Sequence, residues 1–103
     1  MSKSKLSLEI LSGPRDGHVV VVDTETHLSR SGDGILVFPW DTELGEPQAI
    51  FSPEDDGWYL QGMSAAHGTY IVGPSNLEQV TEKRLLSSGD IIKASTEWLI
   101  VLG

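Results

Sequence analysis

Turn-forming residues interrupt this 103-residue chain at short intervals. Glycine, proline, serine, asparagine and aspartate gather in clusters at residues 13–17, 31–34, 53–57, 73–76 and 87–90. Glycine adopts backbone torsion angles that other residues avoid, and proline and asparagine favour chain reversal. Regularly spaced turns between short apolar runs are typical of a β-sandwich or a β-barrel, so the chain is predicted to be all-β.

The runs between the turns are rich in β-branched and aromatic residues, which favour strands. Predicted strands are 6–11, 18–22, 27–30, 35–38, 48–51, 58–61, 69–72, 84–86, 90–94 and 98–102. In the first strand, Ser7 and Glu9 alternate with apolar residues, as expected where one face is buried. The almost continuously apolar runs 18–22 and 98–102 predict strands that either are covered on both faces or close a core. Residues 77–86 are the one helix-like stretch, where we expect a loop with at most one or two helical turns, followed by a strand.

The composition fits one globular domain, since 39% of the residues are hydrophobic. We expect residues 1–5 to form a disordered tail and residues 6–103 to form the domain. The absence of cysteine excludes disulfides, thiolate nucleophiles and cysteine-ligated metals. The sequence has no apolar stretch of the kind a signal peptide needs, so we expect a cytoplasmic location without direct membrane insertion. The oligomeric state stays open.

Acidic residues dominate the charge, and the formal net charge is −8. Nucleic acid is therefore not expected as a partner, because lysine and arginine drive phosphate-backbone binding. Between residues 31 and 82 there is no lysine or arginine, but there are nine aspartates and glutamates. This acidic stretch either serves solubility or forms a face that favours a neutral or basic partner.

Several short motifs occur in a characteristic order. They are Gly13 to Gly17, Ser29-Arg30, Leu44 to Phe51, Asp56-Gly57-Trp58-Tyr59-Leu60, Ala65 to Tyr70, and Leu86 to Ile92 with its Gly89-Asp90. The order and spacing resemble those of forkhead-associated (FHA) domains, over residues 6–102. The resemblance implies a β-sandwich of two twisted, mainly antiparallel sheets, with about eleven short strands, little helix and recognition loops at one end.

FHA domains hold phosphothreonine through three loop positions, and the resemblance carries these onto Arg30, Gly45 and His67. Gly45 replaces a serine and offers no hydroxyl group. The next residue, Glu46, carries the same sign of charge as phosphate, and Gln48 replaces a structural histidine that orders the loops. In the loop that carries His67, Ala65 replaces a further serine, and Ser64 can substitute for it if the loop alignment shifts by one residue. The candidate partner-binding residues are Arg30, Ser31, Gly45, Glu46, Ser64, His67, Gly68 and Thr69.

These departures favour an interaction module, a signalling or assembly adaptor, that binds a partner protein or peptide without strict dependence on phosphothreonine. Each lost charge-assisted hydrogen bond removes about 1.5–3 kcal/mol of phosphate binding. The first alternative is a phosphothreonine-binding domain that is anchored by Arg30. A second alternative, which rests on fold resemblance alone, is a structural cytoplasmic domain of a bacterial secretion-system ring protein.

Catalysis, metals and cofactors are not expected. Ser64 and His67 are close in sequence, but no strand-turn-helix context accompanies them to build a nucleophile site. The histidines lie on separate predicted segments, and the acidic residues 54–57 lack the downstream ligands of a calcium loop.

The three tryptophans are expected to have different roles. Trp58 and Trp98 lie in predicted strands and are expected in the core. Trp40 falls beside a predicted loop, where it either folds back over the end of the sandwich or stays exposed as an anchor for a partner.

Overall fold

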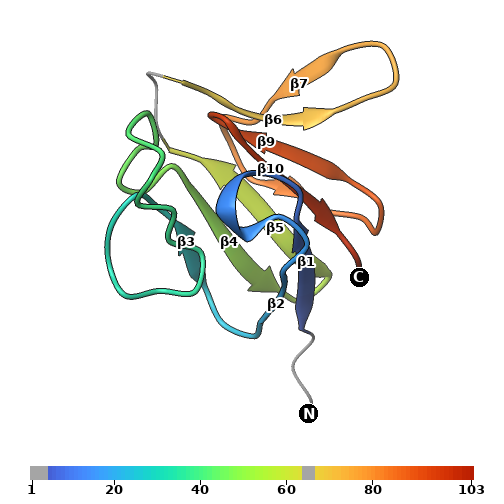
Figure 1. Cartoon of the computed structure of the whole chain (residues 1–103). Coiled ribbons are helices and arrows are strands. Elements are labelled where there is room, and N and C mark those ends of the chain that lie inside the picture. The colour runs from blue at the N-terminus through green and yellow to red at the C-terminus, as the bar shows by residue number, and fades with distance from the viewer. Residues whose placement is uncertain (1–4, 64–66) are drawn as a thin grey trace.

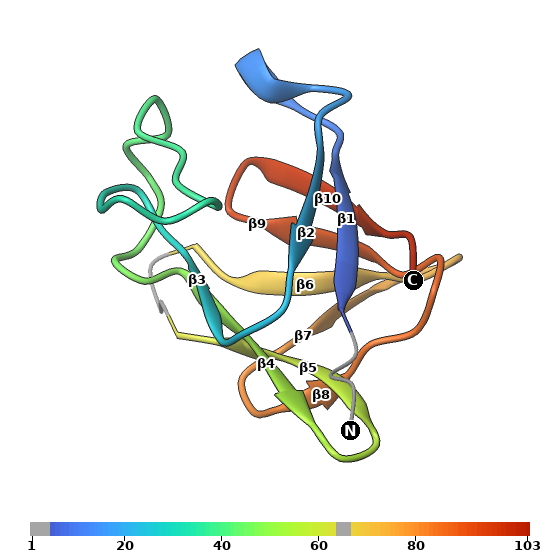
Figure 2. The same ribbon diagram turned by 90° about the horizontal axis from the view of Figure 1, so that it is seen from below.

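Two antiparallel sheets make up the computed structural model, which describes residues 5–63 and 67–103 (Figure 1 and, turned by 90°, Figure 2). The larger sheet has the order β2-β1-β10-β9-β6-β7, and its strands are β1 Leu6–Ile10, β2 Val19–Val22, β6 Thr69–Val72, β7 Leu77–Gln79, β9 Ile91–Ala94 and β10 Glu97–Val101. The smaller sheet has the order β3-β4-β5-β8, with β3 Thr26–Leu28, β4 Ala49–Glu54, β5 Gly57–Gly62 and β8 Arg84–Leu85. The all-β sandwich is therefore confirmed, with ten strands in the described residues.

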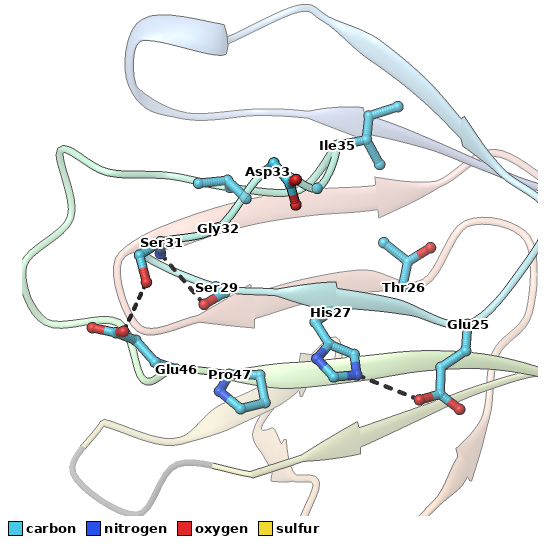
Figure 3. A pocket seen from close by; sticks show the side chains of 12 residues that line it. Glu25, Thr26, His27, Ser29, Ser31, Gly32, Asp33, Ile35, Glu46 and Pro47 are labelled. Carbon is cyan, nitrogen blue, oxygen red and sulfur yellow. Dashed lines mark hydrogen bonds and ion pairs between the residues drawn. The ribbon is translucent and has the colours of Figure 1, made fainter.

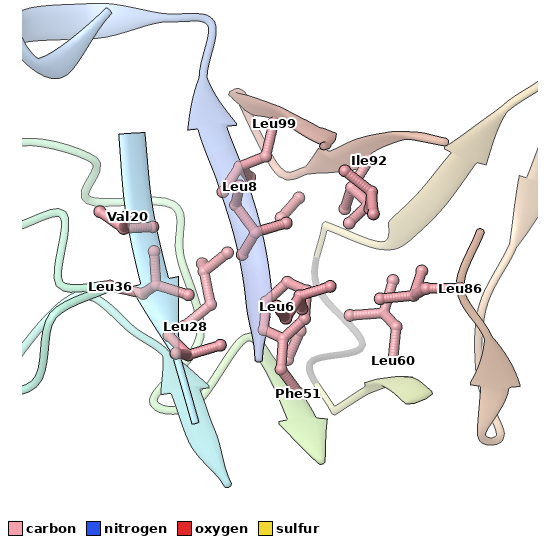
Figure 4. Close-up of a cluster of buried hydrophobic side chains, with 14 of the residues drawn as sticks. Leu6, Leu8, Val20, Leu28, Leu36, Phe51, Leu60, Leu86, Ile92 and Leu99 are labelled. Carbon is pink, nitrogen blue, oxygen red and sulfur yellow. The ribbon is translucent and has the colours of Figure 1, made fainter. Parts of the chain in front are cut away.

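Side chains from both sheets meet in one apolar core (Figure 4). In β1, Leu6, Leu8 and Ile10 are buried while the residues between them are half-buried, which confirms the alternation seen in the sequence. Phe51 and Leu60, from the smaller sheet, are fully buried. Two antiparallel sheets that each bury one face have this arrangement, and apolar burial supplies the main driving force for it.

The prediction of a strand at residues 35–38 is wrong. Leu36 and Phe38 are fully buried, so the alternation of apolar residues does reflect a buried face. The segment runs parallel to β3, however, and is bridged to it only where Ser29 pairs with Val37. Side-chain burial, not a ladder of backbone hydrogen bonds, therefore holds this part of the loop.

Residues 77–79 form an edge strand, β7, where a loop with helical turns was predicted. The strand pairs with β6 through Tyr70–Gln79 and Val72–Leu77, and all its residues are exposed. An exposed edge strand needs no buried face, so the sequence carries no alternating pattern there, and pairing with β6 decides the conformation.

The larger sheet has an outer face that the described residues leave uncovered. Val19 and Val21 are 56% and 49% exposed, so residues 18–22 are not covered on both faces; Val20 and Val22 are buried, and the strand closes the core instead. Trp58 is buried as expected, but Trp98 is half-buried on the outer face of β10. The inward positions of this strand begin with Glu97, which displaces Trp98 from the core.

A short 3-10 helix, η1 (Gly13–Arg15), lies beside the loop that follows β3. Arg15 donates hydrogen bonds from Nη1 to the carbonyl oxygens of Ile35 and Val37, at 2.9 and 3.4 Å, and stacks over the ring of Phe38. These contacts fix the course of the loop. No helix in the described part of the chain is long and apolar enough to cross a membrane.

Substitution of Gly62 by alanine is expected to destabilise the fold. Gly62 ends β5, and a Cβ atom there would lie only 2.1 Å from the carbonyl oxygen of Val80. The backbone must move to admit it, so we expect the free energy of unfolding to fall by about 1–3 kcal/mol in urea titrations. Gly34→Ala is the matched control, because its Cβ atom would meet only Val37 Cγ2, at 3.9 Å. Equal stability of the two variants would contradict the close approach.

Candidate functional site

The side-chain amide of Gln48 joins two loops at one end of the sandwich. Gln48 is fully buried, and its Oε1 accepts a hydrogen bond from the backbone N–H of Gly45, at 2.8 Å. Its Nε2 donates to the carbonyl oxygen of His67 at 2.6 Å and to Thr69 Oγ1 at 3.0 Å. Its backbone N–H donates to the carbonyl oxygen of Leu28, at 2.8 Å. One side chain thus sets the positions of the segments that carry the predicted site.

The Glu46 carboxylate accepts hydrogen bonds from two side chains of the loop end, Arg30 and Ser31. The Arg30 guanidinium forms an ion pair with Glu46 Oε2, and Ser31 Oγ donates to Glu46 Oε1 at 2.7 Å. The hydrogen bond from Ser31 and the positive charge of Arg30 hold the pKa of Glu46 below its usual value. Arg30 also donates from Nη1 to the carbonyl oxygen of Thr42, at 3.4 Å. The charged partner of Arg30 is therefore Glu46.

His67 lies on the other side of the Gln48 amide, and its ring forms a contact with the carboxylate of Glu43. Gly68 follows, and its carbonyl oxygen accepts a hydrogen bond from the N–H of Ser95 at 3.2 Å. Thr69 is buried, and its hydroxyl group is bonded to Gln48. A cavity of about 430 Å³ opens here, lined by Glu43, His67, Gly68, Tyr70, Lys93, Ser95 and Thr96.

A second and larger cavity, of about 540 Å³, lies between β3 and the loop that follows it (Figure 3). Ser31 and Glu46 are at one end of this cavity, and Glu25 is at the other. His27 projects from β3 with its ring 3.4 Å from the Glu25 carboxylate. The cavity therefore continues the Arg30–Glu46 site along the edge of the smaller sheet.

A buried pair of acids anchors the loop that carries the site. Asp41 Oδ2 accepts a hydrogen bond from Thr96 Oγ1 at 2.5 Å, and its other oxygen accepts one from the N–H of Glu43. Glu97 accepts hydrogen bonds from Ser12 Oγ at 3.1 Å and from Trp40 Nε1 at 3.2 Å. Trp40 thus folds back over the end of the sandwich, although 38% of it stays exposed.

The two acids have pKa values that shift in opposite directions. Burial raises the pKa of Glu97, and the nearby Asp41 adds to this effect. Burial also acts to raise the pKa of Asp41, but hydrogen bonds from Thr96 and the Glu43 N–H outweigh it and lower that pKa. The pair therefore favours an ionised Asp41 beside a Glu97 that holds its proton longer than an exposed glutamate.

Comparison with known proteins identifies the fold that carries this loop end. No family model and no curated protein matches the sequence. The FHA domain of CT664 from Chlamydia trachomatis superposes with a TM-score of 0.78 at 14% identity, over 97% of this chain and 98% of that one. The FHA domain of an Arabidopsis thaliana hypothetical protein gives 0.79 at 20% identity, over 97% and 86%. The chain has the FHA fold. The FhaA FHA domain, solved with the intracellular domain of Rv3910, gives 0.73 at 18% identity, over 93% and 98%.

The FHA fold brings most of the predicted site residues to one end. Arg30, Ser31 and Glu46 are in direct contact, while Gly45, His67 and Thr69 are joined through Gln48. Ser64 lies outside the described residues. The pairing of Glu43 with His67 was not predicted, because the two residues lie on different loops and no sequence motif links them. Among residues 5–63 and 67–103, no group of three or more histidine or acidic side chains could hold a metal ion.

Replacement of Gln48 by methionine is expected to loosen the site. Methionine has a similar volume but leaves the Gly45 N–H and the His67 carbonyl unpaired, and each unpaired buried group costs about 1–3 kcal/mol. We expect unfolding stability to fall by about 2–4 kcal/mol and the Gly45 amide hydrogen, which Gln48 holds, to exchange faster with solvent. Gln61→Met, a matched change at a half-buried position of β5, should alter neither. A Gln48 variant as stable as wild type would refute the role of this amide.

Replacement of Glu97 by glutamine is expected to change how stability depends on pH. The folded pKa of Glu97 is raised, so its contribution to stability is complete below the ordinary glutamate pKa and is lost as pH rises through the raised value. Glutamine cannot ionise and can still donate to Asp41. The variant should be more stable than wild type near pH 7, and the difference should shrink on acidification. Thermal melts from pH 3 to 8 test this, with exposed Glu82→Gln as control.

Proposed function

We propose that this chain is an FHA-type interaction module whose loop end binds a partner protein without strict dependence on phosphothreonine. The observation that carries the proposal is the position of Glu46. Its carboxylate already takes the hydrogen bonds of Arg30 and Ser31, the donors nearest to the phosphate position implied by the FHA resemblance. The protein thus supplies its own anion to the site, so a partner need not bring one.

Electrostatics at the loop end supports the same proposal. A phosphothreonine carries a charge of about −2 at neutral pH and needs several strong donors. At this site it would meet the carboxylates of Glu46 and Glu43, and Gly45 offers no hydroxyl group. The phosphate would lose donors and gain like-charge repulsion, so phosphorylation would add little to the affinity of a partner.

Solved FHA domains support the general class of function. One similar structure comes from work on phosphothreonine-dependent FHA domain interactions, with a TM-score of 0.76 at 18% identity over 97% of both chains. Another, FhaA, was solved with a protein domain as its partner. These similar structures favour a protein or peptide partner for this chain. Whether phosphate contributes to binding depends on the residues of its own site.

One observation favours phosphothreonine binding as the second candidate. The side chains of Arg30 and Glu46 are 42% and 41% exposed, and exposed ion pairs of this kind contribute only about 0–1 kcal/mol. A phosphate could therefore compete with Glu46 for Arg30. In that case binding to a phosphopeptide would be lost on dephosphorylation and on Arg30→Ala.

Two variants separate these candidates in calorimetric titrations with a phosphothreonine peptide library and its unphosphorylated counterpart. We expect wild type to show no preference for phosphate. The double variant Gly45→Ser, Glu46→Arg restores the Ser-Arg pair of the family and should gain a phosphate preference of about ten-fold or more, removed by Arg30→Ala. The control is Glu43→Gln, which removes a nearby charge but leaves the Arg30–Glu46 pair intact. A wild-type protein that binds only phosphorylated peptides, through Arg30, would contradict the proposal.

A further inference from the structure

One edge of the smaller sheet is open. Among residues 5–63 and 67–103, β3 is the end strand of that sheet, and its one ladder is with β4. On the other side, the N–H of Ser29 donates to Leu36 and its carbonyl oxygen accepts from Phe38, at 3.0 and 2.9 Å. Backbone groups of alternate residues in a strand point to the same side. The N–H and carbonyl of His27 therefore face the open edge, one step along from Ser29.

The loop after β3 covers this edge only at Ser29. If residues 35–38 formed a full strand, they would pair along β3, but within the described residues a single bridge joins the two segments. Beyond that bridge lies the 540 Å³ cavity, between β3 and residues 31–37 (Figure 3). Its volume falls in the range of about 300–1,000 Å³ that is typical of ligand sites. The space beside His27 is thus where a further strand would lie.

The charge of this cavity has one sign. Glu25, Asp33 and Glu46 line it, and no lysine or arginine is among the described residues that do. His27 is the remaining titratable group there, and its ring lies against Glu25. Glu46 is already paired with Arg30, just outside, so Glu25 and Asp33 supply the net negative charge of the cavity. A lysine or arginine side chain would therefore be attracted, and a phosphate or an acidic segment would be repelled.

We propose that the open edge of β3 binds an extended, unphosphorylated peptide as an added strand, with lysine or arginine side chains directed at Glu25 and Asp33. Backbone hydrogen bonds to His27 supply affinity, and the acidic lining selects the sequence, as in other cases of strand addition. This inference rests on the proposed function, since Ser31 and Glu46 belong to both sites, and it adds the binding mode and the partner chemistry.

The backbone contribution is tested with two substitutions at one residue. A random library of unphosphorylated octapeptides is selected on the wild-type protein, and we expect enrichment of lysine or arginine at alternate positions. His27→Ala keeps the outward N–H but removes the ring beside Glu25, so its affinity for the selected peptide is the reference value for the backbone test. His27→Pro also removes the N–H that points away from β4, and it should bind the peptide about ten-fold more weakly than His27→Ala. Hydrogen exchange of the wild-type His27 amide gives a second readout, and it should slow when the peptide binds.

The charge contribution is tested separately. Glu25→Lys and Asp33→Lys should each weaken binding of the selected peptide by about ten-fold, while Glu82→Lys, exposed and outside the cavity, should not. Strand addition would be overturned if His27→Pro did not change peptide affinity relative to His27→Ala and the peptide did not slow exchange of the His27 amide. If Glu46 substitutions still changed the affinity, the proposed function would stand. Selection of no unphosphorylated peptide, with binding only in a phosphothreonine library, would overturn both.

Discussion

The buried amide of Gln48 is the constraint on which the loop end of this protein depends. A buried amide must have its hydrogen bonds satisfied, and here the partners come from two loops that are far apart in sequence, at Gly45 and at His67. Satisfying them ties the β3–β4 loop to the start of β6. Because the amide is neutral, this tie does not change with pH, unlike one made by the histidine that the FHA resemblance implies at this position. The loop geometry is therefore set independently of the charges around it.

Those charges then decide what the geometry can bind. Glu46 lies two residues before Gln48, so the tie that fixes Gln48 also presents the Glu46 carboxylate to Arg30 and Ser31. The ion pair itself is exposed and weak, and it contributes little to folding. Its importance is chemical, because Glu46 neutralises the charge of Arg30 beside the acidic cavity. Fold and specificity are thus controlled by neighbouring residues with different physical roles.

The sequence predicted the architecture better than the contacts of the site. Turn residues and the alternation in β1 identify the sandwich, because burial of one strand face has a period of two. The same rule wrongly predicted a strand at residues 35–38, where Leu36 and Phe38 are buried without forming a paired strand. β7 was missed because an exposed edge carries no such period. The Arg30–Glu46 pair could not be predicted, since it depends on how two loops approach in space.

The segment around Leu36 leaves the edge of β3 unpaired except at Ser29, and such an edge has consequences for self-association. An unpaired strand edge is a hazard, because it can pair with an identical edge of another molecule. Here the space beside the edge is lined by Glu25, Asp33 and Glu46, so a second copy of the chain would bring like charges into contact. Acidic side chains thus oppose self-association at the same edge where they attract a basic peptide. A buried but unpaired loop and an acidic lining therefore work together: the first keeps the edge available, and the second restricts what can occupy it.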